Sequence, residues 1–116
     1  MLLRLICVDA VASQSEFVIR QFPVSIGRGS EADFVINDSW ASRRNCEINC
    51  DDGCLTIRDL ASRNGTRING ELIHESPLLP GDELTVGIST FLVSAPVSES
   101  SFIGQPVAAD RVLANV

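Results

Sequence analysis

The sequence predicts an all-β fold, a sandwich or a barrel, and three observations support this. Apolar and polar residues alternate with a period of two along most of the chain before residue 94, as in strands with one buried face. The apolar runs are short, and turn-forming residues separate them at close spacing. No helical period interrupts this pattern. At 116 residues the chain has the length of one domain and can close one such core, but not two.

Ten short segments have the pattern expected of strands. In chain order they cover residues 3–8, 16–20, 23–26, 34–36, 44–50, 55–58, 66–68, 71–73, 83–86 and 91–93. Two dipeptides, Asp52-Gly53 and Asn69-Gly70, accept the positive φ angles of tight hairpins, so we expect hairpins there. Leu79-Pro80-Gly81-Asp82 predicts a further turn, because Pro presets φ and the following Gly relaxes it.

The composition changes at Ser94. The stretch from Ser94 to Ser101 is small and polar, and the residues after it carry scattered apolar side chains and a further breaker at Pro106. We therefore expect residues 1–94 to form the folded domain and residues 95–116 to be a flexible tail or linker. A short helix over residues 108–115 is an open alternative near the end of this tail.

The charge of the chain is informative in two ways. The formal net charge of -6 disfavours nucleic acid or an anionic membrane as the main partner, because either would be repelled by the average surface. All nine basic residues are nevertheless Arg, and five of them are expected in or beside loops: Arg28, Arg43, Arg44, Arg63 and Arg67. A bias against Lys in the genome would explain the missing Lys, but not these positions. The planar guanidinium fork matches carboxylate or phosphate oxygens.

The cysteines are expected to pack rather than to react. Arg4 and Asp9 interrupt the apolar start of the chain before a secretory signal could form, and no transmembrane run follows, so we expect a cytoplasmic protein with reduced thiols. On a strand, Cys46 and Cys50 share one face and would line the core, and Cys54 could lie near Cys50 across the hairpin. A metal site or a redox disulfide is a weaker alternative, and we expect no metal and no cofactor.

Three loops combine Arg with residues that favour tight turns. They are Gly27-Arg28-Gly29-Ser30, Ser42-Arg43-Arg44-Asn45 and Ser62-Arg63-Asn64-Gly65-Thr66. A phosphate dianion needs several converging donors, which Arg, hydroxyl and backbone N–H groups supply. Each charge-assisted hydrogen bond contributes roughly 1.5–3 kcal/mol. The loops therefore predict a site for a phosphorylated ligand.

Enzymatic and nucleotide-binding alternatives find less support. The chain has no Gly-x-Ser-x-Gly elbow, no Tyr and a single His, His74. Residues 27–32 match a dinucleotide fingerprint, but that motif must open a helix, and a strand followed by a turn is expected at residues 32–38. We expect neither catalysis nor a small-molecule substrate.

With these motifs in order, the chain resembles a forkhead-associated (FHA) domain from about residue 2 to residue 93. The resemblance rests on Gly27-Arg28, the second and third Arg loops, Asn69-Gly70, and residues 79–84 and 86–87. It implies a two-sheet β-sandwich of about eleven mostly antiparallel strands, the SMAD/FHA-like architecture. It also implies a module that binds a phosphothreonine-containing protein or peptide in Ser/Thr kinase signalling and is not an enzyme.

The resemblance assigns roles to individual residues. Arg28 would bind a phosphate oxygen and anchor its loop, Ser42 would donate its hydroxyl to the phosphate, and Arg43 would add a second cationic contact. Asn64 would hydrogen-bond the ligand backbone beside the phosphothreonine, with Arg63 near the phosphate or the same backbone. The residues expected to shape the loops rather than to touch the ligand are Gly27, Asn45, Gly65, Thr66, Asn69 and Gly70.

One position departs from the family pattern. Asn45 stands where the family has a His that braces the loop, and Asn reaches less far. A phosphate-independent docking or self-association domain with a degenerate site therefore stays open as an alternative. The tail offers no Thr for self-recognition, because the four threonines all lie before residue 94 in or beside expected strands. We therefore expect the phosphothreonine to come from another protein, in trans.

Overall fold

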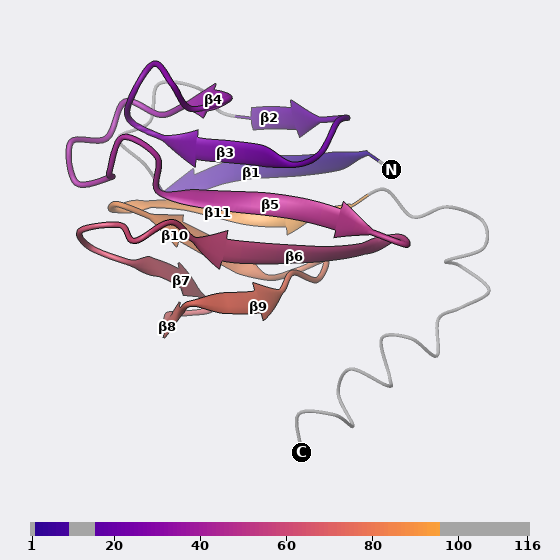
Figure 1. Cartoon of the computed structure of the whole chain (residues 1–116). Coiled ribbons are helices and arrows are strands. Elements are labelled where there is room, and N and C mark those ends of the chain that lie inside the picture. Colours follow the sequence, from indigo (N-terminus) through magenta and orange to yellow (C-terminus); the bar gives the residue numbers. More distant parts are fainter. Residues whose placement is uncertain (1, 10–15, 96–116) are drawn as a thin grey trace.

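The computed structural model describes residues 2–9 and 16–95, which form eleven strands in two sheets packed face to face (Figure 1). In spatial order, the first sheet holds β2 (Glu16–Ile19), β1 (Leu3–Asp9), β11 (Ser89–Ser94), β10 (Glu83–Val86), β7 (Thr66–Ile68) and β8 (Glu71–Ile73). The second holds β4 (Phe34–Val35), β3 (Val24–Gly27), β5 (Cys46–Asp51), β6 (Cys54–Asp59) and β9 (Glu75–Pro77). All pairings are antiparallel except β3 with β4. The predicted all-β sandwich is confirmed.

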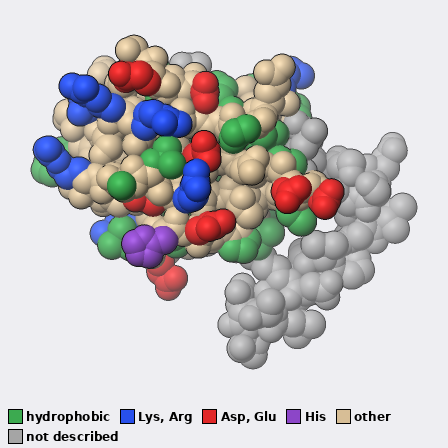
Figure 2. All heavy atoms as spheres, in the orientation of Figure 1, with side chains coloured by type: hydrophobic (Ala, Val, Ile, Leu, Met, Phe, Trp, Pro, Cys, Tyr) green, Lys and Arg blue, Asp and Glu red, His purple; other side chains and the backbone are tan. Residues whose placement is uncertain are grey.

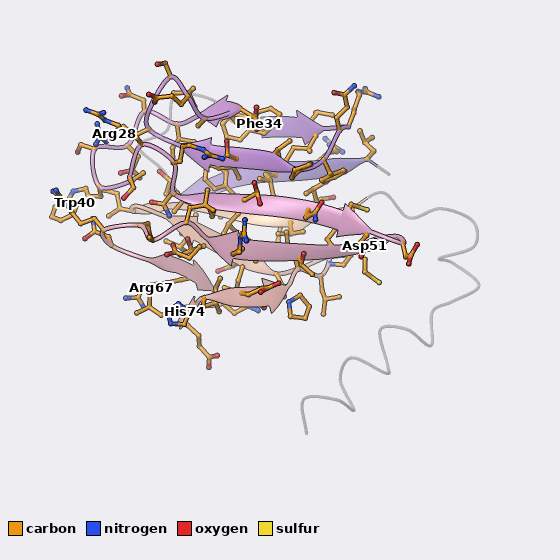
Figure 3. All side chains as sticks on the ribbon, viewed as in Figure 1. Arg28, Phe34, Trp40, Asp51, Arg67 and His74 are labelled. Carbon is orange, nitrogen blue, oxygen red and sulfur yellow. The ribbon has the colours of Figure 1, made fainter. Side chains whose placement is uncertain are left out.

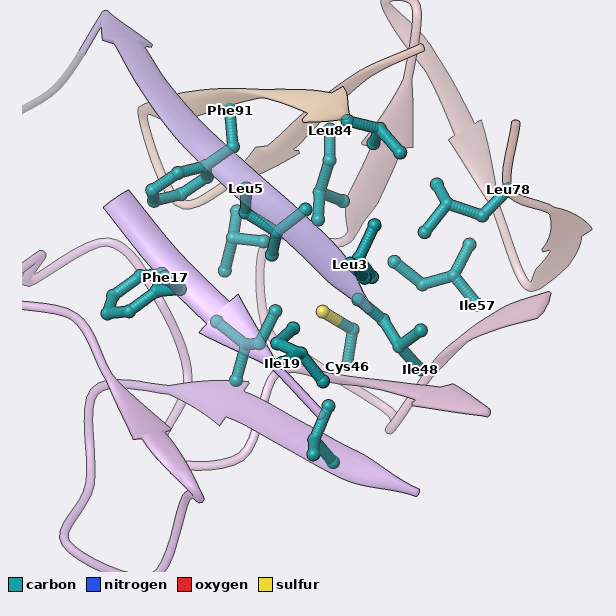
Figure 4. Close-up of a cluster of buried hydrophobic side chains, with 14 of the residues drawn as sticks. Leu3, Leu5, Phe17, Ile19, Cys46, Ile48, Ile57, Leu78, Leu84 and Phe91 are labelled. Carbon is teal, nitrogen blue, oxygen red and sulfur yellow. The ribbon is translucent and has the colours of Figure 1, made fainter. Parts of the chain in front are cut away.

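The core lies between the two sheets, where the alternating apolar residues meet (Figure 4). Leu3 and Leu5 project into it from β1, and Ile48 and Ile57 face them from β5 and β6, all with no exposed surface. Phe17 contacts Phe91 at a ring-centroid distance of 5.7 Å. Apolar contact between the sheets supplies the main stabilisation, and Ile36 and Ala41 of the β4–β5 loop also belong to this core.

Both predicted Gly-containing hairpins form with the expected backbone geometry. Asp52 and Gly53 have φ angles of 53° and 78° between β5 and β6, and Asn69 and Gly70 have φ angles of 53° and 86° between β7 and β8. Two successive positive φ angles are typical of the turn whose twist matches that of paired strands.

Several strand ends differ from expectation by one or two residues, and three differences have a clear physical reason. Strand β9 was not predicted, because Glu75–Pro77 is polar and contains Pro; it pairs at the edge of its sheet, where Pro is tolerated. Strand β5 begins at Cys46 rather than at residue 44, since Asn45 is held by the loops described below. Cys54 pairs with Asp51 and Cys50 with Leu55, so the side chains of Cys50 and Cys54 leave opposite faces of the hairpin, and their expected proximity is wrong.

The loops that carry the Arg motifs all lie at one end of the sandwich, at the left in Figure 1, together with the β10–β11 turn. The β5–β6 hairpin lies at the other end. The chain beyond residue 95, with its expected tail and helix, lies outside the described residues. Within the described part of the chain, no helix has the length and apolar character needed to cross a membrane.

Candidate functional site

A groove of about 650 Å³ opens at the loop end of the sandwich. Its walls come from the β3–β4 loop, the β4–β5 loop and the β6–β7 loop, which are far apart in sequence. The lining residues are Arg28, Ser39, Trp40, Ala41, Ser42, Arg43, Arg63 and Asn64. All five side chains predicted to contact a ligand are therefore brought together, along with a Ser39–Ala41 segment that the sequence analysis did not single out.

Backbone hydrogen bonds join the first two loops. The amide of Arg28 donates to the carbonyl of Ser42 at 2.9 Å, and the amide of Gly29 donates to the carbonyl of Arg43 at 3.0 Å. This close approach requires glycine at position 27, because a Cβ there would lie 2.1 Å from the carbonyl oxygen of Arg43. Gly27 thus sets the distance between the two Arg-bearing loops.

The guanidinium groups of the groove keep most of their donors available. Arg28 donates from Nε to the carbonyl of Ala41 at 2.9 Å, which fixes the side chain and leaves its two terminal nitrogens unbonded within the described chain. The side chains of Arg43 and Arg63 make no hydrogen bond or ion pair with any described residue. Blue Arg side chains stand out at this end of the molecule in Figure 2. Since no lining residue carries a carboxylate, the groove is cationic.

The hydroxyl of Ser42 is positioned to donate outward. Its oxygen accepts a hydrogen bond from the amide of Arg63 at 2.8 Å, which ties the second loop to the third. Because that bond occupies a lone pair and not the hydroxyl hydrogen, the O–H remains a donor for a ligand. Asn64 is fixed in the same way: its Nδ2 donates to the carbonyl of Trp40 at 2.7 Å, while its Oδ1 accepts nothing among the described residues.

A buried polar network supports these loops from below. Asn45 has no exposed surface, and its Oδ1 accepts the amide hydrogen of Ser42 at 2.9 Å. Its Nδ2 donates to the carbonyl of Gly65 at 3.2 Å and to the hydroxyl of Thr66 at 3.0 Å. Thr66 in turn donates to Asp59 at 2.7 Å. Asn45 therefore spans the second and third loops despite its short side chain, and every polar atom it buries is satisfied.

The carboxylate of Asp59 anchors the base of this network. Partial burial by itself would raise its pKa, but hydrogen bonds from Ser62 and Thr66 and the positive field of His74 together lower the pKa below its ordinary value. The backbone amide of Ser62 also donates to Asp59, at 3.0 Å. The third loop is therefore held in place by an ionised side chain.

The remaining motif residues lie outside the groove. Arg44 and Arg67 are exposed but do not line it. Asn69 accepts from the amide of Glu83 at 2.9 Å and donates to Asp82 at 3.0 Å, so these bonds join the β7–β8 hairpin to the start of β10. Gly65 has a φ of 87°, which disfavours any other residue there, and an added Cβ would displace the end of the exposed Leu72 side chain.

The cysteines take no part in the groove. All four are free thiols, and no group of three side chains able to hold a metal ion exists among the described residues. Burial, with a smaller effect from the charge of Asp59, raises the pKa of the Cys46 thiol to about 12. Cys46 is thus an inert packing residue, as its face of the strand predicted.

Trp40 is a groove residue that was not predicted from the sequence. Its side chain is 57% exposed although it lines the groove, and Figure 3 shows it at the same end as Arg28. A single Trp in a short polar segment, outside the period-two pattern, was the available signal, because such a residue has no strand face on which to be buried.

Comparisons with known proteins agree with this geometry. The FHA domain family model matches residues 24–87. Over 77 residues the chain is 36% identical to the FHA domain-containing protein FhaA of Mycobacterium tuberculosis, a match that covers 66% of this chain and 15% of FhaA. Over 88 residues it is 32% identical to the glycogen accumulation regulator GarA of Mycolicibacterium smegmatis, covering 75% of this chain and 56% of GarA.

Solved structures give the same result. A structure from a study of phosphothreonine-dependent FHA domain interactions superimposes with a TM-score of 0.74 at 32% identity, covering 83% of this chain and 98% of that one. The FHA domain of FhaA, complexed with the intracellular domain of Rv3910, superimposes with a TM-score of 0.71 at 34% identity and covers 78% of this chain and 98% of that one. The fold, the order of the motifs and the matched region agree, and the chain belongs to the FHA domain family.

Proposed function

We propose that the chain is a phosphothreonine-dependent interaction module that binds a phosphorylated segment of another protein in Ser/Thr kinase signalling. The proposal extends to this chain the phosphothreonine-dependent interactions studied for one solved FHA domain and the complex that another forms with an intracellular protein domain. In it, Arg28, Ser42 and Arg43 bind the phosphate, and Arg63 and Asn64 bind the adjacent ligand backbone. The module acts by binding and not by catalysis, in the cytoplasm where kinases and their substrates meet.

The observation that carries the proposal is the convergence of unpaired donors on one groove. Arg28, Arg43 and Arg63 come from three loops and lack carboxylate partners among the described residues, in a chain whose net charge is -6. Like charges repel, so such a cluster is costly unless an anion occupies it. A phosphorylated side chain carries a charge of about −1.5 to −2 and three acceptor oxygens, which matches the number and type of donors.

The loops are also held in place before any ligand arrives. Three loop-to-loop contacts, Arg28 to Ala41, Arg63 to Ser42 and Asn64 to Trp40, restrict the donors. Less conformational entropy is then lost on binding, which raises affinity for a given set of contacts. Asn45 joins the second and third Arg loops with its own hydrogen bonds. Replacement of the family His by Asn therefore keeps the two loops connected.

A binding comparison tests the proposal. A degenerate phosphothreonine peptide library and its unphosphorylated twin are titrated against the wild type, Arg28→Ala and Arg58→Ala. Arg58 is the matched control, because it is an exposed Arg on β6 paired with Glu47 at 2.9 Å and absent from the groove. We expect the phosphorylated library to bind at least ten-fold more tightly, and this preference to vanish only in Arg28→Ala.

Equal binding of the two libraries by the wild type would contradict the proposal and favour a phosphate-independent docking domain. Full discrimination by Arg28→Ala would show that the phosphate binds elsewhere.

A further inference from the structure

Strand β2 is an open edge of the six-stranded sheet. Its backbone pairs with β1 on one side, and residues 17–19 make no backbone hydrogen bond with any other described residue. Beside this edge lies a hollow of about 390 Å³, lined by Val18 and Arg20 and, from the second sheet, by Val24 and Phe34. Val18 is 41% exposed. Within the described chain, the outer side of β2, near the top of Figure 1, therefore presents N–H and C=O groups to another strand.

The other three sheet edges are shorter, and one of them is blocked. Strand β4 has two residues, β8 has three, and β9 has three, of which Pro77 has no N–H to donate to a further strand. Strand β2 has four residues and contains neither Pro nor Lys, two residues that commonly protect an edge from pairing. Because folded proteins usually protect long edges, the unprotected edge of β2 indicates a partner strand.

The charges along β2 are arranged symmetrically. Glu16 and Arg20 stand two positions before and two positions after Val18, and these three side chains share the outer face of the sheet, while Phe17 and Ile19 between them are buried. When two antiparallel copies of β2 pair about a two-fold axis at Val18, Val18 faces its own copy and Glu16 faces Arg20 of the other copy at both ends. Opposite charges directly across an antiparallel pair stabilise it. Strand β2 is thus complementary to itself.

Both charged side chains can make these contacts. The guanidinium group of Arg20 has no hydrogen bond or ion pair with any described residue. Glu16 pairs with Arg4 of the neighbouring strand through Oε2, which holds the carboxylate on the outer face of the sheet. A carboxylate has lone pairs for several donors, so Glu16 can accept from a second guanidinium group as well. Each end of the paired strands would then hold one carboxylate between two guanidinium groups.

We propose that the chain forms a two-fold symmetric dimer through β2, in which the six-stranded sheets of two copies join into one continuous sheet. The partner is a second copy of the chain, because symmetry then supplies both Glu16–Arg20 contacts and the Val18 contact at the axis. None of the residues that line the cationic groove lies on β2, so the dimer leaves both grooves open. Dimerisation requires neither phosphate nor Arg28, and it goes beyond the proposed function.

Sedimentation equilibrium of the full chain measures the association. The paired segment is short, so we expect a weak dimer with a dissociation constant of about 10–100 μM. Arg20→Glu and Glu16→Arg each place like charges opposite one another at both ends of the pair, and each should weaken the dimer by at least about ten-fold. Val18→Lys places two ammonium groups at the axis and should abolish the dimer.

A mixture of the two charge-reversed proteins provides the sharpest test. Arg20→Glu and Glu16→Arg in equal amounts should form a heterodimer with about the wild-type affinity, because Glu again faces Arg at both ends. The double variant Glu16→Arg/Arg20→Glu should restore the homodimer for the same reason. Association in the mixture also shows that each variant is folded. Arg67→Glu is the matched control, since Arg67 is an exposed residue of β7, three strands away from β2 or more, and this variant should dimerise like the wild type.

The outcomes separate the dimer from the proposed function. A wild type that stays monomeric up to about ten times the expected dissociation constant, or a mixture that fails to associate, overturns the dimer, and the edge would then be open to a strand of another protein. Arg28→Ala should dimerise like the wild type. Loss of phosphothreonine discrimination in an intact dimer contradicts the proposed function alone, and discrimination by a monomeric wild type contradicts the dimer alone.

Discussion

The two ends of the sandwich are built on different principles. At one end, the β5–β6 hairpin turns through Asp52 and Gly53, both with positive φ, and an added Cβ at Gly53 would meet no atom within 4 Å. At the other end, an added Cβ at Gly27 would collide with the backbone of Arg43. The hairpin needs glycine for its own backbone conformation, whereas the groove needs it because a distant segment lies against it.

The same contrast holds for the contacts that fix each end. The hairpin turn is closed by strand partners only three positions apart in sequence, Asp51 and Cys54. The loop end depends on bonds that span the chain, such as Asn45 to Gly65 and Ser89 to Asp38. A turn whose conformation is determined locally tolerates changes elsewhere in the chain. The geometry of the groove, in contrast, depends on contacts between segments that are distant in sequence. The proposed binding site thus lies at the end whose geometry the whole fold maintains.

Gly27→Ala should have the largest effect. The new Cβ would push the β3–β4 loop away from Arg43 and weaken the paired backbone hydrogen bonds at Arg28 and Gly29, at a cost of about 4 kcal/mol. Urea denaturation measures the change, and phosphopeptide affinity should fall with it. An unchanged midpoint would mean that the loops do not pack as closely as the structure shows.

Asn45→Ala should come next, with a loss of about 3 kcal/mol, because the Ser42 amide and the Gly65 carbonyl would each lose a buried partner. Asn49→Ala is the matched control, since Asn49 is an exposed residue of the following strand β5, and it should change stability by about 0.5 kcal/mol or less. Equal effects from the two variants would show that the network under the groove contributes nothing.

Gly53→Ala should be milder, at about 1 kcal/mol, because only the φ of 78° opposes a side chain there. Phosphopeptide affinity should be unaffected, in contrast to Gly27→Ala. A loss of binding in Gly53→Ala would contradict the separation of the two ends.

The smallest effect should appear in acid. The folded pKa of Asp59 is lowered, so its contribution to stability is complete above the ordinary value of 3.8 and disappears as the pH falls through the lowered value. Stability measured by urea denaturation between about pH 5 and about pH 2 should therefore fall less steeply in Asp59→Asn than in the wild type. Ser62→Ala, which removes one donor to Asp59, should move this loss toward higher pH. Identical dependence of stability on pH in all three proteins would show that the Asp59 carboxylate does not stabilise the fold through this network.

Some features were predictable and others were not, for physical reasons that individual residues illustrate. The core positions Ile48 and Ile57 followed from the period-two alternation, and the turn at Asn69 followed from its tolerance of positive φ. Strand β9 was not predicted, because it is a strand through its pairing with β6 and its composition gives no strand signal. Trp40 escaped because strand periodicity carries no information about exposed loop residues.

The sequence by itself determined the all-β class, the hairpin turns and the FHA motif order, since alternation and turn conformation depend on a few neighbouring residues. The tertiary structure alone decided that the Arg side chains of three loops would share one groove and that Asn45 would join Ser42 to Gly65 and Thr66. It also decided that one buried carboxylate, Asp38, would accept hydrogen bonds from the backbone amides of both Trp40 and Ile88. The packing of the two sheets determines these hydrogen-bond partners, because only that packing brings segments that are distant in sequence within hydrogen-bonding distance.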